Sequence, residues 1–145
     1  MNVLVIDVGG THVKILVSGE SEPRRFASGP TLTAGQMVAG VKKIAADWKY
    51  DAVSIGFPGP VLRKSTSCGT TPPNLGKGWV GFNFKSDFAC PVRLVNDAAM
   101  QGLGSYKHKK MLFLGLGIGL GSTLIVDGIV EPMELGPPPL QEGDL

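Results

Sequence analysis

Cysteine is scarce in this sequence, and so are aromatic residues, long apolar runs and an excess of either charge. The two cysteines, Cys68 and Cys90, have no metal-ligand spacing, so we expect reduced thiols rather than a disulfide framework or a zinc site. The longest uncharged run, residues 111–126, contains four glycines and is shorter than the roughly 20 apolar residues of a membrane helix. No basic segment precedes the first apolar run. We therefore expect a cytoplasmic protein without a secretory signal or a membrane partner.

The charge balance indicates no nucleic-acid partner. The 14 basic side chains against 12 acidic ones give a net charge of +2. The one dense basic run, residues 107–110, has no accompanying aromatic or recognition-helix pattern, which favours a solvated loop.

Glycine and proline are abundant instead, at 21 and 11 of 145 residues, and they follow no fixed period. They indicate many turns within an ordinary globular chain, since the hydrophobic share is 43% and the charged share is 18%. We expect one domain over residues 1–136. Residues 137–145 begin with three prolines and are expected to form an irregular tail.

The apolar patterns predict a mixed α/β sheet with helices. Thr33 and Gln36 have the spacing of a capping box, so the sequence predicts a helix from Thr33 to Lys49, and a second helix is predicted after Asn96-Asp97. The stretch 58–90 is rich in turn-forming residues and is too long for an ordinary connection, so we expect one long loop that is either functional or disordered. Strands are expected at 3–6, 13–17, 24–28, 52–57, 92–95, 111–116, 122–126 and 129–130.

The first candidate site is the stretch VIDVGGTHVKI, in which Gly9 and Gly10 lie between two strands. Glycines there allow consecutive backbone N–H groups to face an anion, Thr11 adds a hydroxyl, and the carboxylate of Asp7 can hold magnesium. A plain hairpin that ends in an aspartate is the commoner structure, so both interpretations stay open. The second glycine-rich stretch has glycines at 115, 117, 119 and 121, and it is either a close approach to a ligand or glycine packed against backbone.

Two further pairs contain candidate catalytic or binding side chains. Asn96 and Asp97 follow a strand and precede a helix, and either is an ordinary N-cap residue. Capping needs only one of them, so the carboxylate of Asp97 can instead face a cleft and act as a general base towards a hydroxyl. Glu131 and Glu134 lie in an apolar context, either as ligands of sugar hydroxyls or as exposed turn residues.

The order of these features resembles the actin-like ATPase (ribonuclease H-like) fold of sugar kinases, in which two glycine-rich hairpins clasp phosphates. The motifs VIDVGGTHVKI, SIGFPGPV, TPPNLGKGW, RLVNDAAMQGLG, LGLGIGLGSTLIVDG and EPMELG resemble the ROK family (repressors, open reading frames, kinases), especially its polyphosphate glucokinase-like branch. The likeness covers residues 2–136 and places them in the N-terminal half of such a kinase. Two residues depart from the family pattern: Leu116, where a threonine is usual, and Pro137, where a histidine is usual.

The resemblance implies transfer of a phosphoryl group from ATP or polyphosphate to the 6-hydroxyl of glucose or a related hexose, with magnesium. It implies that Asp97 is the catalytic base, that Asn96 and Glu134 bind the sugar, and that Asp7 organises the metal. It also implies that a set of hairpin residues contacts phosphate: Gly9, Gly10, Thr11, Gly117 and Gly119.

Two other interpretations stay open. The chain can be a truncated half that binds phosphate or sugar without turnover, since an open half-site does not exclude water. A sugar-responsive repressor is disfavoured because no DNA-binding helices precede the first strand. Under any of these interpretations we expect self-association through an exposed apolar face.

Overall fold

The fold is described from a computed structural model of the chain. It describes residues 1–59, 61, 69, 71–72, 74–116 and 120–131. The chain forms two compact units, Met1–Asp97 and Ala98–Leu145, and each is described by itself. The predicted domain limits stay a prediction, and the predicted tail, residues 137–145, lies outside the described residues.

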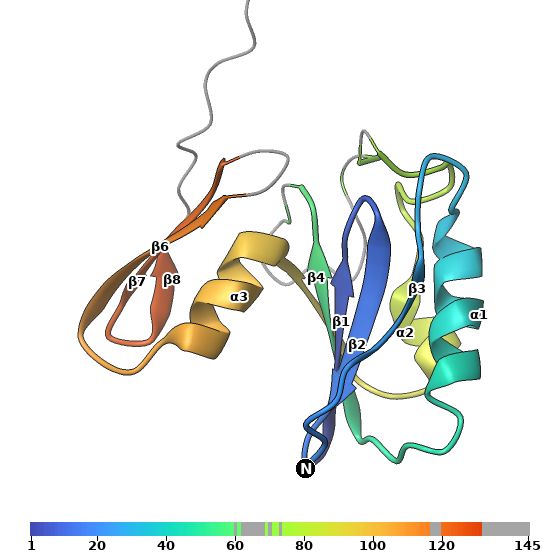
Figure 1. Cartoon of the computed structure of the whole chain (residues 1–145), viewed down its shortest axis with the longest axis horizontal. Coiled ribbons are helices and arrows are strands. Elements are labelled where there is room, and N and C mark those ends of the chain that lie inside the picture. Colours follow the sequence, from blue (N-terminus) through green and yellow to red (C-terminus); the bar gives the residue numbers. More distant parts are fainter. Residues whose placement is uncertain (60, 62–68, 70, 73, 117–119, 132–145) are drawn as a thin grey trace, which may run out of the picture. The chain divides into compact units, whose positions relative to one another are not determined.

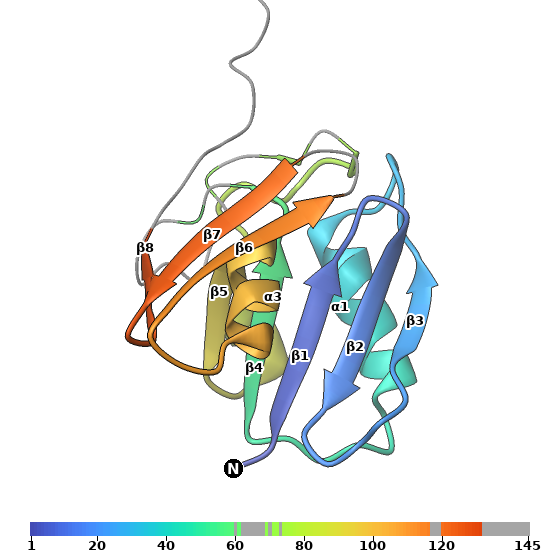
Figure 2. The ribbon, with the colours of Figure 1, turned by 60° about the vertical axis from the view of Figure 1, so that its left-hand side comes forward.

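A five-stranded mixed sheet is the frame of the first unit (Figure 2). Strand β1 lies at its centre, pairs antiparallel with β2 and parallel with β4, and the strand order is β3-β2-β1-β4-β5. The predicted strands are therefore present, with β1 in the central place that its apolar run indicated. Their bounds are β1 Val3–Val8, β2 His12–Val17, β3 Arg24–Ala27, β4 Ala52–Phe57 and β5 Val92–Asn96.

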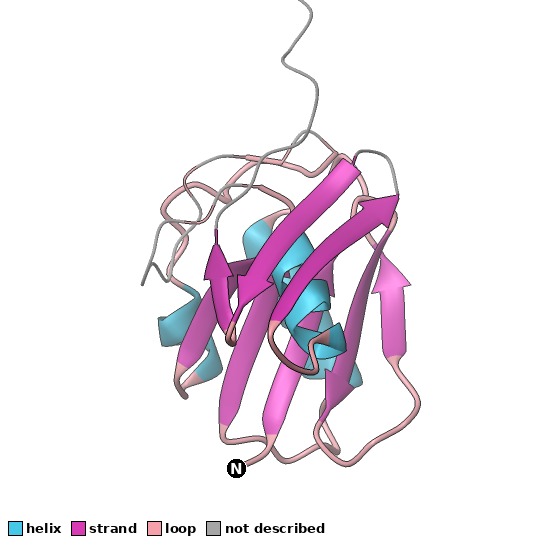
Figure 3. Cartoon of the chain, turned by 90° about the vertical axis from the view of Figure 1, so that its left-hand side faces the viewer, coloured by secondary structure: helices cyan, strands magenta, loops and turns pink. Residues whose placement is uncertain are grey.

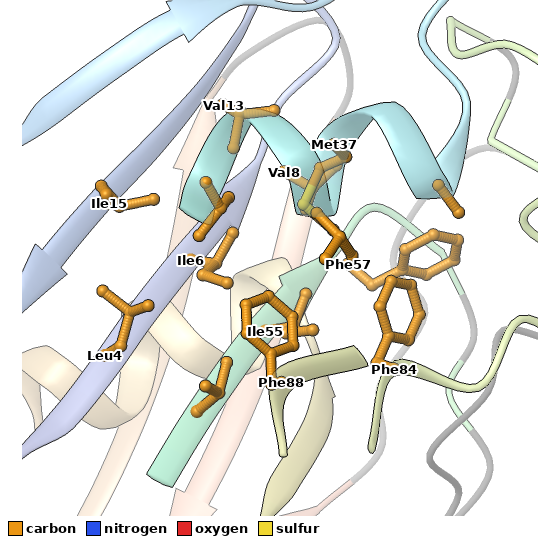
Figure 4. Packing of buried hydrophobic residues seen from close by; sticks show 14 of the residues in the cluster. Leu4, Ile6, Val8, Val13, Ile15, Met37, Ile55, Phe57, Phe84 and Phe88 are labelled. Atoms are coloured by element: carbon orange, nitrogen blue, oxygen red, sulfur yellow. The ribbon is translucent and has the colours of Figure 1, made fainter. Parts of the chain in front are cut away.

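Two helices cover one face of this sheet (Figure 1). Helix α1 (Ala34–Ile44) directs Met37, Val38 and Val41 into a buried cluster formed with alternate residues of β1 and β2. Helix α2 (Phe84–Phe88) adds Phe84 and Phe88 to the same cluster beside Phe57 and Ile55, as Figure 4 shows. The burial of these apolar side chains is the main stabilising contribution to the first unit.

Helix α1 begins as predicted but ends five residues early. The predicted capping box is present, with the Thr33 side chain accepting from the backbone N–H of Gln36. The predicted end at Lys49 is wrong, because Arg24 of β3 donates to the carbonyl of Ile44 and forms an ion pair with Asp47 just beyond it. A tertiary hydrogen bond thus occupies a carbonyl at the C-terminus of the helix and fixes the turn that follows.

The stretch predicted as one long loop contains both α2 and a strap, which we define as residues 74–79. Trp79 at its end is fully buried and packs against Phe57 and Phe84, with ring centroids 5.9 Å and 6.4 Å apart. The Trp79 indole N–H and the Gly76 backbone N–H both donate to the carbonyl of Leu32, at 3.0 Å and 2.9 Å. The strap is therefore fixed by core contacts at Trp79 and by hydrogen bonds to Leu32.

The second unit consists of a helix on a three-stranded antiparallel sheet, drawn in Figure 3. Helix α3 starts at the last residue of the first unit, and one glycine in the helix and one in the sheet allow close packing. A Cβ on Gly102 would lie 3.3 Å from the Cβ of Phe113, and one on Gly121 would lie 3.1 Å from the Cβ of Ala98. The bounds are α3 Asp97–Ser105, β6 Lys110–Leu116, β7 Leu120–Val126 and β8 Ile129–Glu131.

Candidate functional site

The candidate site lies at the carboxyl edge of the parallel strands β1, β4 and β5. Asp7 on β1 is level with Gly56 on β4, and the next residue of β4, Phe57, is level with Asn96 on β5. Parallel strands place their carboxyl ends at one edge of a sheet, where α/β folds bind ligands. The fold thus brings Asp7, Asn96 and Asp97 to this edge, although some 90 residues of sequence separate the first from the other two.

The turn between β1 and β2 is closed at the same edge by short backbone contacts. The Gly9 N–H donates to the carbonyl of His12 at 3.0 Å, and a Cβ on Gly9 would lie 2.8 Å from that oxygen. Glycine is needed here for a close approach, because neither Gly9 nor Gly10 has a positive φ. Among the described residues, none accepts a hydrogen bond from the N–H of Gly10 or Thr11. Two consecutive donors of this kind suit a phosphoryl oxygen.

Asp7 carries a perturbed carboxyl group. Burial raises its pKa above the ordinary value, the nearby Lys14 lowers it, and the carboxylate of Asp97 raises it again. Lys14 is the cross-strand partner of Asp7 on β2, so its charge is fixed beside the site by strand register. Perturbed carboxyl groups of this kind cluster at functional sites.

Asn96 and Asp97 join the end of β5 to the start of α3. The Asn96 side-chain amide donates to the carbonyl of Gly59 at 3.3 Å, which ties β5 to the turn after β4. Asp97 is the first residue of α3, where the helix dipole favours a negative charge. Asn96 therefore stabilises this edge of the sheet, while Asp97 places a carboxylate at it.

A magnesium ion fits this arrangement. The described residues contain no group of three or more possible metal ligands. Magnesium, however, is often held by one or two carboxylates together with substrate phosphates and water. Asp7 supplies such a carboxylate, and a cation beside it would relieve the repulsion by Asp97 that raises the pKa of Asp7.

The second glycine-rich hairpin is only partly described. Gly115 on β6 is paired with Gly121 on β7, so the hairpin itself is present as predicted. At Gly121 the packing interpretation holds, because the residue faces Ala98 of α3. The predicted phosphate residues Gly117 and Gly119 and the predicted sugar ligand Glu134 lie outside the described residues.

Two residues at the site had no role in the sequence analysis. The Ser28 hydroxyl donates to the carbonyl of Gly9 at 2.6 Å, and the Ser28 backbone N–H donates to the carbonyl of Thr11 at 2.9 Å. Asn74 lies against Gly10, where a Cβ would be 3.1 Å from the Cβ of Asn74. The motif TPPNLGKGW marked the region of Asn74, while no local signal marked Ser28, which reaches the turn only through the pairing of β2 with β3.

The fold is the predicted one, an α/β fold of the actin-like ATPase type, as its likeness to solved structures shows. Solved kinases share the fold. A ROK family glucokinase from Streptomyces griseus, solved with glucose and AMPPNP, has a TM-score of 0.74 at 23% identity and matches 92% of this chain and 47% of that one. An inorganic polyphosphate/ATP-glucomannokinase from Arthrobacter sp. strain KM has a TM-score of 0.73 at 23% identity, over 92% of this chain and 61% of that one.

The family follows from the sequence comparison. The model of the ROK family matches residues 3–132, and the chain belongs to that family. A curated relative, a glucokinase from Pyrobaculum calidifontis, is 28% identical over 131 residues, which are 88% of this chain and 44% of that protein. The chain thus spans less than half the length of this curated relative.

Within the described residues, no helix combines the length and apolar character that crossing a bilayer requires. The basic run at residues 107–110 is exposed; residues 107–109 form the loop before β6, and Lys110 is the first residue of that strand.

Proposed function

We propose that this chain carries the donor-binding turn and the catalytic base of a sugar kinase. The reaction is transfer of a phosphoryl group from ATP or polyphosphate to the 6-hydroxyl of glucose or a related hexose. One observation carries the proposal: Asp7 and Asp97 interact electrostatically at one sheet edge, beside a turn with two available N–H donors. Phosphoryl transfer depends mainly on positioning and on neutralising charge, which the N–H donors and a magnesium ion held by Asp7 would supply, with Asp97 positioned as the base.

Asp97 acts on the sugar in this proposal. Its carboxylate accepts the proton of the hydroxyl as the oxygen attacks phosphorus, a contribution of roughly 10²–10⁴ in rate. The side-chain oxygen of Asn96 accepts a hydrogen bond from a neighbouring sugar hydroxyl, while its side-chain NH2 group still donates to the carbonyl of Gly59. Glu134 is proposed as a further sugar ligand.

The phosphoryl donor is held by the hairpins. The N–H groups of Gly10 and Thr11 and the Thr11 hydroxyl bind its oxygens, Gly9 shapes the turn, and Gly117 and Gly119 are proposed to contact it from the second hairpin. Asp7 holds magnesium, with Asp97 close by. When bound, this ion neutralises phosphate charge. Polyphosphate is proposed beside ATP because the sequence motifs resemble the polyphosphate-using branch.

The direct test is formation of glucose 6-phosphate by the purified 145-residue chain with magnesium, with ATP and polyphosphate supplied separately. Asp97→Asn should lower turnover by roughly 10²–10⁴. Asp87→Asn is the matched control, because Asp87 is an exposed aspartate of α2, and it should leave turnover unchanged. Equal turnover in the wild-type chain and Asp97→Asn would refute the role of Asp97 as the base.

Binding without turnover is the second candidate function. These residues match 44% of the curated glucokinase, and closure of a kinase over its substrates completes the catalytic site, so binding without turnover is expected where these 145 residues are assayed alone. A folded chain that binds tripolyphosphate or glucose but forms no glucose 6-phosphate would select this function over the first.

Self-association is proposed to involve the exposed face of β6. Leu112, Leu114 and Leu116 lie on that face and are 51%, 51% and 91% exposed. Among the described strands, β6 pairs only with β7, so its outer edge is available to another strand. Sedimentation velocity should show a dimer that Leu114→Lys converts to monomer, and a monomeric wild-type chain would contradict this.

A further inference from the structure

The strap, residues 74–79, is fixed at three points, although the proposed function gives it no role. Trp79 is buried in the core, and its indole N–H donates to the Leu32 carbonyl. Gly76 donates to the same carbonyl, and Leu75, which is only 6% exposed, donates its N–H to Pro72. The start of the strap is therefore held in place by its own anchors, without any help from its first side chain.

That first side chain, Asn74, lies against the phosphate-binding turn. Its Cβ and its amide nitrogen are 3.1 Å and 3.5 Å from the position that a Cβ on Gly10 would occupy. Asn74 is exposed, and in the described part of the chain its carboxamide has no hydrogen-bond partner. The amide thus has a free donor next to the N–H groups of Gly10 and Thr11, which are also available.

We infer that Asn74 is a phosphoryl-binding residue, with its side-chain N–H donating to the same phosphoryl group that the Gly10 and Thr11 amides bind. The inference rests on the proposed function of that turn. A neutral donor suits this place, because a carboxamide adds a hydrogen bond to an anion without a desolvation cost as large as that of a second cation. A glycine at residue 10 also suits this contact, since a Cβ there would lie 3.1 Å from the Cβ of Asn74 and would crowd it.

The test measures binding of inorganic tripolyphosphate with magnesium to the 145-residue chain by isothermal titration calorimetry. Asn74→Ala removes the amide and keeps the Cβ that contacts the turn. Asn74→Asp keeps the size and shape and replaces the donor with a negative charge. Asn2→Ala is the matched control, an exposed asparagine at the other end of β1, where the hydrogen bond to Asp51 uses its backbone N–H.

We expect Asn74→Ala to weaken binding about tenfold, since a hydrogen bond to a charged group is lost. Asn74→Asp should weaken it further, and Asn2→Ala should match the wild type. All variants should keep the thermal midpoint of the wild type, because Asn74 does not anchor the strap. If Asn74 acts in binding, Asn74→Asp should bind tripolyphosphate more weakly than Asn74→Ala. If Asn74 acts only in packing, the isosteric Asn74→Asp should be the milder change.

Two results would overturn the inference in distinguishable ways. If the wild type binds tripolyphosphate and both Asn74 variants bind it equally well, Asn74 has no role while the turn keeps its proposed function. If the wild type itself does not bind, the phosphate-binding turn fails as a proposal and the role of Asn74 fails with it.

Discussion

Replacing Gly76 with alanine should destabilise the first unit through a backbone collision. The added Cβ would lie 2.8 Å from the carbonyl carbon and oxygen of Thr31 and 2.9 Å from the carbonyl oxygen of Leu32. These are backbone atoms of the segment that leads into α1, so no side-chain rotation can remove the contact. The strap must instead move away from Leu32.

The cost has two parts. Overpacking of a tightly fitted site costs about 1–3 kcal/mol. Moving the strap also lengthens the 2.9 Å hydrogen bond from Gly76 to Leu32, which adds about 1 kcal/mol. The free energy of unfolding should therefore fall by about 2–4 kcal/mol, a large share of the stability of a domain of this size.

Urea denaturation followed by tryptophan fluorescence measures this change, because Trp48 and Trp79 both lie in the unit Met1–Asp97. Gly35→Ala is the matched control. Gly35 lies in the first turn of α1, and the nearest atom to an added Cβ is 3.9 Å away. The free energy of unfolding of Gly35→Ala should therefore rise by up to about 1 kcal/mol from helix propensity. If Gly76→Ala unfolds within about 0.5 kcal/mol of the wild type, within the usual range of surface substitutions, the collision argument is refuted.

Asp7→Asn should raise the free energy of unfolding at pH 7 and leave it unchanged near pH 3. Burial raises the pKa of Asp7, so the stability contributed by its neutral form is lost as pH rises through that pKa. Urea denaturation at both pH values checks this. In α3, Gly102→Ala should lower the thermal midpoint, since its Cβ would crowd Phe113, while Gly104→Ala, with open space, should raise it. Arg24→Met should return the pKa of Asp47 from about 2 toward 3.8 in an NMR titration, and a pKa still near 2 would contradict the ion pair as its cause.

The sequence predicted the fold where local pattern and tertiary structure agree. The capping box at Thr33 and the apolar run of β1 specify their elements without help from distant residues. The C-terminus of α1 was not predictable in this way, because it depends on Arg24, 20 residues away in sequence from the carbonyl that it binds. The buried strap was missed for a similar reason, since its polar and glycine-rich composition is that of a loop, although Leu75 and Trp79 enter the core.

The residues of the candidate site were likewise predicted from the sequence only where a local pattern marked them. Asp7, Asn96 and Asp97 were found because a polar residue at the end of a buried strand is a local signal. The register that puts Asp7 and Asp97 at one edge depends on the parallel pairing of β1, β4 and β5, which strand patterns alone do not give. Ser28 and Asn74 reach the turn through tertiary contacts, so single-sequence reasoning had no basis for naming them.

The contacts of Ser28 have a thermodynamic consequence. With the carbonyls of Gly9 and Thr11 both held by Ser28, and the Gly9 N–H held by His12, the turn is already ordered before any anion arrives. A receptor that is rigid beforehand loses little conformational entropy on binding, so more of the interaction energy appears as affinity. If the proposed phosphate site is correct, Ser28→Ala should leave each of its proposed donors in place and still weaken phosphate binding, with the loss appearing as a less favourable entropy.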